Sequence, residues 1–587
     1  MVAVCFLLSL FILIKFFSYY LLGGIDKCYY LCTIIAVTCC TSKIKIIYKP
    51  YRKMKKTFII PVLALVAMVS CNQKESSPFE WNTSKYAVVD IEVPDLSGIT
   101  DNGKEVLNLY RFAADEVDSI YWEQYFGDKK SLLDNITDSV EKTFVEINYG
   151  PWDRQDGTSF VEGYADRTPG AGFYPADMTA EEFEAYNNPD KNSPYTLIRR
   201  AKDGSLETVW YHDAFAGHIE KIANYLKAAA DITIKPSVRN YLLSKIEALR
   251  TDRYYDSGIA WLDMNDSKMD LVIGPNEVVD DQLMGIKRSY EAFVLLKNQQ
   301  RTEELMEFVS RIGEFQQDLP CDSAYKTFQP GTGSNIFACD ALYYAGKANA
   351  GVKVIALNLP FDNDVQRDKG TRTILLDNII RAKYNNIILP AGKVLLTLEA
   401  SEHLLGDAFY WNIVFREVAH GLGVKETING KGSVEQALGS VAPTLEELKA
   451  TAAGVLLVCH LQKHFEIRHI FGKEEALNTF FVSLVRSERF GEGSALGRAN
   501  IMIFNYLKEA GAFERKPSGQ YILNLKKMEE SLSNLTSLVL KIQATGDKAA
   551  ADELEAKYSK TSKEFEADKQ NLIVAGVPTD IRFNFKR

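Results

Sequence analysis

One short stretch restricts the fold more than any other part of the chain. Residues 415–423 read F-R-E-V-A-H-G-L-G, in which Glu417 and His420 are three positions apart and therefore share one face of a helix. This spacing is that of the zinc-binding pattern H-E-x-x-H, whose glutamate acts on a metal-bound water. The first histidine of the pattern is replaced by Arg416, which stays protonated in proteins and has no lone pair for zinc. The sequence therefore predicts a zinc-site helix and also argues against ordinary zinc chemistry.

A second predicted helix follows at residues 443–451, which begin P-T-L-E-E-L-K. Its Glu447 lies 27 positions after His420, and a glutamate on a downstream helix commonly completes a zinc site of this kind. The alternative is that Glu446 and Glu447 are ordinary carboxylates, which the helix dipole favours near a helix N-terminus. Taken alone, the spacing favours this ordinary interpretation.

Composition places the chain among globular proteins with more than one domain. It has 587 residues, of which 46% are hydrophobic and 25% charged, and its formal net charge is -9. An acidic chain gives no electrostatic case for nucleic-acid binding, so we expect no nucleic-acid partner. Beyond residue 71 only three cysteines remain, and their spacing fits neither a disulfide framework nor a zinc site.

The N-terminal region carries a signal in an unusual place. Residues 54–71 consist of a basic start, an apolar stretch and a small residue before Cys71, which is the form of a bacterial lipoprotein signal peptide. Such signals stand at the start of a protein, so we expect translation to begin at Met54 and residues 1–53 to be a spurious extension. The alternative is a membrane hairpin, since residues 2–24 are apolar enough to span a bilayer. Lipidation of Cys71 would anchor the protein in the bacterial cell envelope, on the periplasmic or the surface face.

Periodicity predicts a mainly helical α+β fold after a polar tether at residues 72–94. Apolar residues recur at helical spacing or in strand-like runs, whereas one stretch is rich in Gly, Pro, Asp and Tyr. The pattern predicts helices at 95–145, 211–250, 405–422, 443–465 and 525–572, loops at 146–210, short strands with a helix at 290–297 within 252–300, and strands at 352–359 and 577–585.

Several segments resemble the dipeptidyl peptidase III family of zinc metallopeptidases, in its shorter bacterial form. They follow one another in the family's order, from about residue 95 to the C-terminus. The segments are D-L-V-I-G-P-N-E at 270–277, N-A-G-V-K-V-I-A-L-N-L-P at 349–360, E-V-A-H-G-L-G at 417–423, L-E-E-L-K-A at 445–450 and G-R-A-N at 497–500.

The resemblance implies two lobes around a wide cleft: a helical upper lobe that carries the zinc and a mixed lower lobe with a small β-barrel. Carried over from the family's layout, the lower lobe takes residues 95–297, 334–383 and 546–587. The upper lobe takes residues 298–333 and 384–545.

The resemblance also implies residue roles. His420 and Glu447 would bind zinc, Glu417 would be the catalytic base, and Glu277 and Asn358 would hold the peptide substrate. Four departures fall on functional positions: Arg416 replaces a zinc histidine, Thr451 an acidic residue, Leu496 a histidine and Phe361 an asparagine. Four changes at one site, with the framework motifs retained, suggest that catalysis has been given up.

These observations lead to two hypotheses. The first is a peptide-binding pseudo-peptidase, a monomeric lipoprotein with the hydrolase fold, impaired catalysis and doubtful zinc binding. The alternative is an active zinc-dependent exopeptidase that releases N-terminal dipeptides and takes a third zinc ligand from elsewhere. Under the first hypothesis, we expect the guanidinium of Arg416 to replace the charge of the metal by pairing with Glu417, and with Glu447 if it lies within reach. His460 and His464 are four positions apart, but satisfied or surface histidines are the favoured interpretation.

Overall fold

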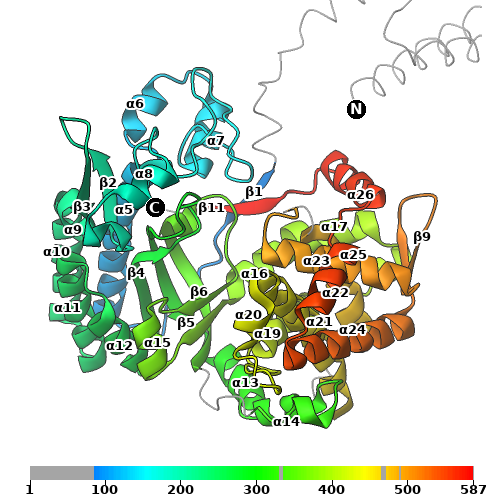
Figure 1. Cartoon of the computed structure of the whole chain (residues 1–587). Coiled ribbons are helices and arrows are strands. Elements are labelled where there is room, and N and C mark those ends of the chain that lie inside the picture. Colours follow the sequence, from blue (N-terminus) through cyan, green and yellow to red (C-terminus); the bar gives the residue numbers. More distant parts are fainter. Residues whose placement is uncertain (1–84, 329–334, 465–470, 488–490, 586–587) are drawn as a thin grey trace, which may run out of the picture. The chain divides into compact units, whose positions relative to one another are not determined.

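The central sheet is built from strands that lie far apart in the sequence (Figure 1). The computed structural model describes residues 85–328, 335–464, 471–487 and 491–585, which belong to one unit, Ser77–Arg587. The sheet has the strand order β4-β5-β6-β8-β7; its neighbours are antiparallel except for the parallel pair β6 and β8. The strands are β4 (Met269–Glu277), β5 (Ser289–Lys297), β6 (Asn335–Gly346), β7 (Ala356–Leu359) and β8 (Arg372–Leu376).

The second strand of the sheet corrects one expectation. Residues 290–297 were predicted to form a helix, whereas they lie in β5 and pair with β4 on one side and β6 on the other. All but the last residue of β5 are buried. A continuous apolar run of this length fits a buried strand and a buried helix equally well, because neither then shows a polar face.

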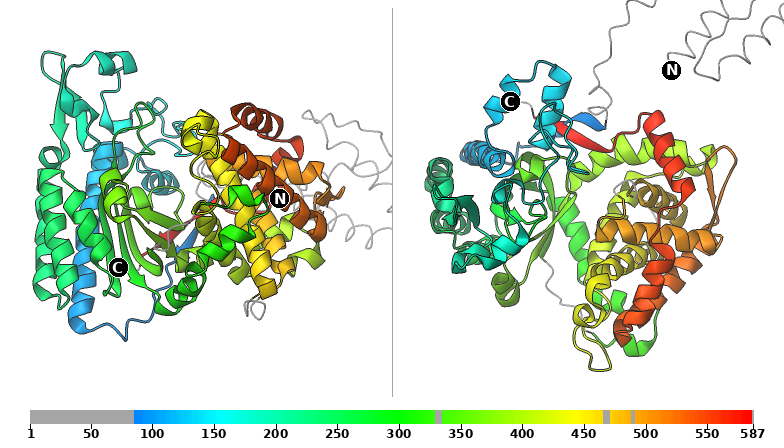
Figure 2. Two further views of the ribbon diagram at one scale, coloured as in Figure 1. Left: turned by 60° about the horizontal axis from the view of Figure 1, so that its bottom comes forward. Right: turned by 45° about the horizontal axis from the view of Figure 1, so that its top comes forward.

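Helices stack against the sheet in successive layers. Helix α5 (Asp101–Tyr125) packs on β5 and β6, α10 (Ala216–Ile232) packs on α5, and α11 (Pro236–Thr251) packs on α10. Figures 1 and 2 show the three helices running side by side along one face of the sheet. The hydroxyl of Thr100 caps α5 by accepting a hydrogen bond from the backbone N–H of Gly103. Its apolar residues recur at helical spacing and are buried, as the sequence predicted.

The second half of the chain forms a group of packed helices. Helix α19 (Gly406–His420) lies against α21 (Ala442–His464), and α21 also contacts α22 (Lys473–Ser487), α23 (Ala495–Glu509) and α24 (Leu525–Thr545). Both α19 and α21 match the predicted ranges 405–422 and 443–465 closely. Figure 1 shows these helices in yellow to orange, away from the layer of α10 and α11.

The two ends of the described chain meet. Strand β1 (Tyr86–Asp90) pairs in parallel with β11 (Asp580–Asn584). The terminal strand was predicted within residues 577–585, but β1 lies inside the range 72–94 that was expected to be a tether. The ordered fold thus begins earlier than expected, because β1 receives its hydrogen-bond partner from the far end of the chain. The predicted signal peptide, the extension at 1–53 and Cys71 lie outside the described residues.

The remaining elements are short, and several fall within residues 146–210, which were expected to be loops. None of the described helices is long and apolar enough to cross a membrane. The remaining elements are α6 (Lys129–Asp134), α7 (Ser139–Asn148), α8 (Ala180–Ala185), β2 (Thr196–Arg200), β3 (Leu206–Trp210), α9 (Tyr211–Ala214), α12 (Tyr255–Asp263), α13 (Gln299–Val309), α14 (Ile312–Asp318), α15 (Asn363–Lys369), α16 (Asp377–Lys383), α17 (Leu389–Leu395), α18 (Leu398–Ser401), α20 (Val434–Leu438), β9 (Phe513–Arg515), β10 (Tyr521–Leu523), α25 (Lys548–Tyr558) and α26 (Lys563–Val574), with short 3-10 turns and one π turn between them.

Candidate active site

Helices α19 and α21 bring two of the predicted site residues, His420 and Glu447, together with Glu446. His420 is the last residue of α19, and Glu446 and Glu447 lie in the first turns of α21. The Nδ1 atom of His420 lies 3.2 Å from Oε1 of Glu446, and its Nε2 atom lies 3.7 Å from Oε2 of Glu447. The imidazole therefore faces both carboxylates, and the two helices predicted from spacing lie side by side.

A glycine sets the distance between the two helices. A Cβ atom on Gly454 of α21 would lie 2.8 Å from the backbone N and 2.9 Å from the Cα of Arg416 on α19. These atoms belong to the backbone, so they cannot move aside as a flexible side chain would. The absence of a side chain at Gly454 thus allows α21 to approach α19 at the residue that replaces the first histidine.

Glu446, rather than Glu447, receives most of the polar contacts in the site. The Nζ atom of Lys449 lies 2.8 Å from its Oε1, the Nζ atom of Lys425 lies 3.9 Å away, and Gln543 donates to its Oε2 at 3.3 Å. Burial raises the pKa of Glu446, but Lys449, His420 and Lys425 outweigh burial and hold the pKa well below its usual value. Burial lowers the pKa of Lys449 to about 8, although Glu446 opposes that shift.

Arg416 pairs with the residue predicted to be the catalytic base. Its Nη2 atom lies 2.9 Å from Oε1 of Glu417. Among the described residues no ion pair joins Arg416 to Glu447. Of the two carboxylates that Arg416 was expected to contact, it therefore pairs only with Glu417. The Nε atom of Arg416 and the Oε2 atom of Glu447 are buried and have no hydrogen-bond partner in the described part of the chain. The site therefore retains an unsatisfied carboxylate oxygen next to His420.

The side chains present do not fit a three-ligand zinc site. Two ligands bound tetrahedrally at about 2.1 Å stand about 3.4 Å apart, and the 3.7 Å between His420 and Glu447 is close to that separation. The third donor is missing because Arg416 occupies its position, and the described ranges hold no group of three His, Cys, Asp or Glu arranged to bind a metal. Two of the three protein ligands of such a zinc site, His420 and Glu447, are therefore present, and the third is missing.

The predicted peptide-binding residues lie on the sheet. Glu277 ends β4, and burial raises its pKa, although nearby Lys347 and Arg288 oppose the shift. Asn358 lies on β7, is exposed and accepts a hydrogen bond from Thr373 at 3.4 Å. Within the described chain, no hydrogen bond or ion pair connects Glu277 or Asn358 with the residues of α19 and α21.

The other degenerate positions are occupied by side chains that do not contribute a metal or substrate ligand. Leu496 lies in the first turn of α23, two residues before Arg498, which donates to Thr444 on α21 at 3.2 Å. The hydroxyl of Thr451 is buried and has no hydrogen-bond partner among the described residues. Phe361 lies beneath the guanidinium of Arg288, at 5.6 Å from the ring centroid.

The remaining described histidines are each paired with a carboxylate. This agrees with the expectation that they are satisfied or surface histidines rather than metal ligands. The side chains of His464 and His469 are not among those described. The pairs are His212 with Asp252 at 2.8 Å, His218 with Glu116 at 2.6 Å, His403 with Glu475 at 3.0 Å and His460 with Asp318 at 3.2 Å.

Sequence reasoning missed two residues that shape this site. Lys425 donates to the carbonyl oxygen of His420 at 2.7 Å, and Gln543 reaches Glu446 from α24. Gln543 lies 97 positions from Glu446 in the sequence. No motif in the residues around Gln543 indicates that it belongs to the site. Lys425 follows the first motif closely, but only the path of the chain after α19 shows that it turns back to the site.

Comparisons with known proteins agree with this fold. The model of peptidase family M49 matches residues 185–424. The structure of dipeptidyl peptidase III from Caldithrix abyssi is 30% identical, with a TM-score of 0.81, and the match covers 86% of this chain and 98% of that one. The corresponding structure from Corallococcus sp. strain EGB is also 30% identical, with a TM-score of 0.73 over 86% and 96% of the two chains. Nudix hydrolase 3 of Arabidopsis thaliana is 27% identical over an alignment of 571 residues, gaps included, that covers 85% of this chain and 73% of that protein.

The fold and the paired helices define a peptidase-fold protein of the α+β class, mainly helical and with a curved five-stranded sheet. This agrees with the two-lobed architecture expected from the sequence. The chain belongs to the dipeptidyl peptidase III family, peptidase family M49. The resemblance drawn from five short segments is thereby confirmed.

Proposed function

We propose that this member of the family is a peptide-binding pseudo-peptidase whose zinc-dependent catalysis is impaired. One observation carries the proposal: Arg416 occupies the position of a zinc ligand and lies 2.9 Å from Glu417. Glu277 and Asn358 remain in place as candidates for holding a peptide. Under this proposal the chain keeps two residues that would bind a peptide, Glu277 and Asn358, and lacks the zinc ligand at position 416.

The positive charge of Arg416 explains why this one substitution would impair both zinc binding and the catalytic base Glu417. With His420 and Glu447 alone, the affinity for zinc falls steeply, because a catalytic site uses three protein ligands. Without the metal, water keeps a pKa far above neutral, so a carboxylate at Glu417 has little to activate. The guanidinium of Arg416 also occupies one oxygen of that carboxylate.

The test compares zinc content and peptidase activity in one set of variants. Purified protein is dialysed against trace zinc, analysed for bound metal and assayed with a dipeptidyl-naphthylamide. We expect less than one tenth of an equivalent of zinc and no turnover. Arg416→His should raise the zinc content several-fold, whereas Arg239→His on an exposed part of α11 should leave it unchanged.

Two results would contradict the proposal. Near-stoichiometric zinc with turnover in the unaltered protein would mean that a replacement ligand exists and that the protein is an active exopeptidase. Failure of Arg416→His with Leu496→His to bind zinc, in a folded sample, would mean that Arg416 is not the residue that excludes the metal.

The location and partners form a separate proposal. The lipoprotein signal before Cys71 supports a lipid anchor in the cell envelope. We also propose a monomeric body and, by analogy with the peptidase family, a peptide as the ligand. Expression of residues 54–587, starting at Met54, in a bacterium with labelled fatty acid should label the protein and place it in the membrane fraction. Cys71→Ser should abolish both, and labelling of that variant would exclude this anchor. Light scattering of the purified body checks the oligomeric state.

A further inference from the structure

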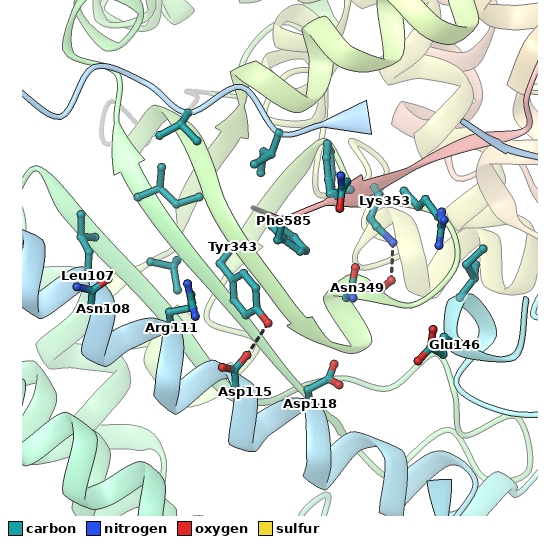
Figure 3. Close-up of a pocket in the computed structure, with 18 of the residues that line it drawn as sticks. Leu107, Asn108, Arg111, Asp115, Asp118, Glu146, Tyr343, Asn349, Lys353 and Phe585 are labelled. Atoms are coloured by element: carbon teal, nitrogen blue, oxygen red, sulfur yellow. Dashed lines mark hydrogen bonds between the residues drawn. The ribbon is translucent and has the colours of Figure 1, made fainter. Parts of the chain in front are cut away.

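The acids of one large cavity show how carboxylates in this molecule are satisfied. In the cavity of about 940 Å³ that Figure 3 shows, Tyr343 donates its hydroxyl hydrogen to Asp115. Asp118 accepts hydrogen bonds from the hydroxyl of Tyr149 and, at 3.1 Å, from the backbone N–H of Gly346. Such pairing is expected, because a carboxylate oxygen that loses water without gaining another donor costs free energy.

Three carboxylates depart from this pattern. Each has one buried oxygen without a hydrogen-bond partner among the described residues, and these oxygens are Oδ1 of Asp340, Oδ1 of Asp377 and Oε2 of Glu447. The first two lie near a guanidinium, since Nη2 of Arg381 is 3.5 Å from Asp340 and Nε of Arg301 is 3.9 Å from Asp377. No lysine or arginine of the described chain forms an ion pair with Glu447, whose oxygen faces an imidazole instead.

That imidazole, of His420, does not supply the missing donor. Its Nδ1 atom lies 3.2 Å from Oε1 of Glu446, and a carboxylate can only accept, so Nδ1 carries the ring hydrogen. In the neutral imidazole the Nε2 atom then has a lone pair. The 3.7 Å between Nε2 and Oε2 of Glu447 also exceeds the upper limit of about 3.2 Å for a hydrogen bond. Two acceptors therefore face each other with no donor between them.

The position between these two acceptors suits a primary ammonium group. Because the acceptors are 3.7 Å apart, one nitrogen can stand about 2.8 Å from both of them. An ammonium group has three hydrogens, so it can donate one to Nε2 of His420 and one to Oε2 of Glu447, and the third remains for water. The two side chains are 28% and 24% exposed, so a group of a ligand can approach them from solvent.

The charges around this position favour a monovalent cation over a divalent one. Arg416 lies 2.9 Å from the predicted catalytic base, and the amines of Lys449 and Lys425 lie 2.8 and 3.9 Å from Glu446. Glu447 is the carboxylate of the site that has no such partner in the described chain. One positive charge balances it, whereas zinc would add a second charge and would lack its third protein ligand.

We propose that a primary ammonium group of the peptide ligand occupies the position between His420 and Glu447, where the side chains do not fit zinc. This inference rests on the proposed function, because it takes a bound peptide as given. Hydrogen bonds from a charged donor to a charged acceptor are the strong ones, so the contact with Glu447 would select peptides that carry an amine. The α-amine of a peptide and the side chain of lysine share this chemistry, and the test separates the two sources.

Two pairs of tripeptide amides test the proposal by isothermal titration calorimetry in the presence of EDTA. The first pair is N-acetylated and has lysine or norleucine between two alanines; the second is trialanine with a free or an acetylated N-terminus. We expect the amine-bearing member of at least one pair to bind at least about tenfold more tightly than its partner. Glu447→Gln keeps the size of the side chain and should abolish this preference. Glu426→Gln, at an exposed position six residues after His420, is the matched control and should keep it.

The pair that shows the preference identifies the source of the amine. The proposal is overturned if neither pair shows a preference, or if the preference survives Glu447→Gln; its loss in Glu277→Gln alone would place the amine at the sheet. Equal binding of all four peptides would leave the proposed peptide-binding function intact, whereas binding of none would contradict that function as well. Circular dichroism confirms that each variant is folded, and His420→Phe, which should also abolish the preference, decides the matter if Glu447→Gln does not fold.

Discussion

At the scale of single residues, Arg372 shows how the sheet holds a charge in its interior. Its guanidinium is fully buried, lies 3.2 Å from Asp270, and donates to the carbonyl oxygen of Leu262 at 3.0 Å and to Asn265 at 2.8 Å. Removing one partner of a buried ion pair leaves the other charge uncompensated. We expect Arg372→Met to lower the free energy of unfolding by about 3–5 kcal/mol, measured by urea denaturation.

The control for this prediction is Arg239→Met, since Arg239 is exposed on α11. It should change the unfolding free energy by no more than about 0.5 kcal/mol. A loss of similar size in both variants would show that burial of the Arg372–Asp270 pair does not matter.

Glu291 on β5 predicts a pH dependence. Burial, and then the charge of Glu277, raise its pKa from 4.5 to about 8. The folded state therefore binds a proton more tightly than the unfolded state, and stability falls as the pH rises from about 4.5 to about 8. Glu291→Gln should remove a fall in unfolding free energy of the order of 5 kcal/mol between these pH values.

Urea denaturation at a series of pH values checks this expectation. Glutamine keeps the size of the side chain and still has an oxygen that accepts the hydrogen bond from Asn276. The control, Glu247→Gln on exposed α11, should leave the pH profile unchanged. Parallel pH profiles for Glu291→Gln and the unaltered protein would refute the assignment.

Residues whose role depends on local spacing could be predicted, and those that act from a distance could not. The sequence predicted that His420 and Glu447 would lie together because each belongs to a recognisable helical motif. It predicted the pairing of Arg416 with Glu417, but it could not predict that Glu446 would contact Lys449 and Gln543. Such contacts depend on how the helices pack against each other, and local sequence patterns carry no information about that packing.

At the scale of elements, the contact between α19 and α21 depends on Gly454. A methyl group there would lie 2.8–2.9 Å from backbone atoms of Phe415 and Arg416. Because backbone atoms cannot rotate away, we expect Gly454→Ala to push the helices apart and to lower the unfolding free energy by about 1–3 kcal/mol. Thermal and urea denaturation measure the change.

Gly217 on α10 supplies the matched control. A Cβ atom at Gly217 would meet nothing within 4 Å, so alanine there should stabilise the helix by up to about 1 kcal/mol. The two glycines thus predict effects of opposite sign for the same substitution. Stabilisation by Gly454→Ala would mean that the helices can separate without cost.

Most long helices were predictable, whereas two strands were not. Helices α5, α10, α19 and α21 lie near their predicted ranges because helical periodicity or cap residues mark them. Strand β5 was predicted as a helix because it is buried along almost its whole length. Strand β1 was missed because its partner β11 lies at the other end of the chain.

At the scale of the whole molecule, Asp580 ties the last strand to the rest of the fold. Its Oδ2 atom accepts a hydrogen bond from the amine of Lys383 at 2.9 Å and from the backbone N–H of Lys353 at 3.2 Å. Arg486 lies 3.9 Å away. We expect Asp580→Asn to lower the unfolding free energy by about 3–5 kcal/mol, because cations buried around it lose their counter-ion.

Hydrogen exchange checks where that loss acts. The amides of β1 and β11 should lose protection in Asp580→Asn before those of the central sheet do. Asn584→Ala removes only an exposed hydrogen bond to Asp90 and should cost less than about 1 kcal/mol. Unchanged protection of β1 in Asp580→Asn would show that the strand pair holds without this carboxylate.

The pairing of β1 with β11 also constrains how the molecule is made. Asn584 donates to Asp90 across a separation of 494 residues. At about 5–20 residues per second, a ribosome needs roughly 25–100 seconds to travel from one to the other. Throughout that interval the first strand of the fold has been synthesised and its hydrogen-bonding edge has no partner. The strand pair can therefore form only after the ribosome has synthesised the chain through Asn584.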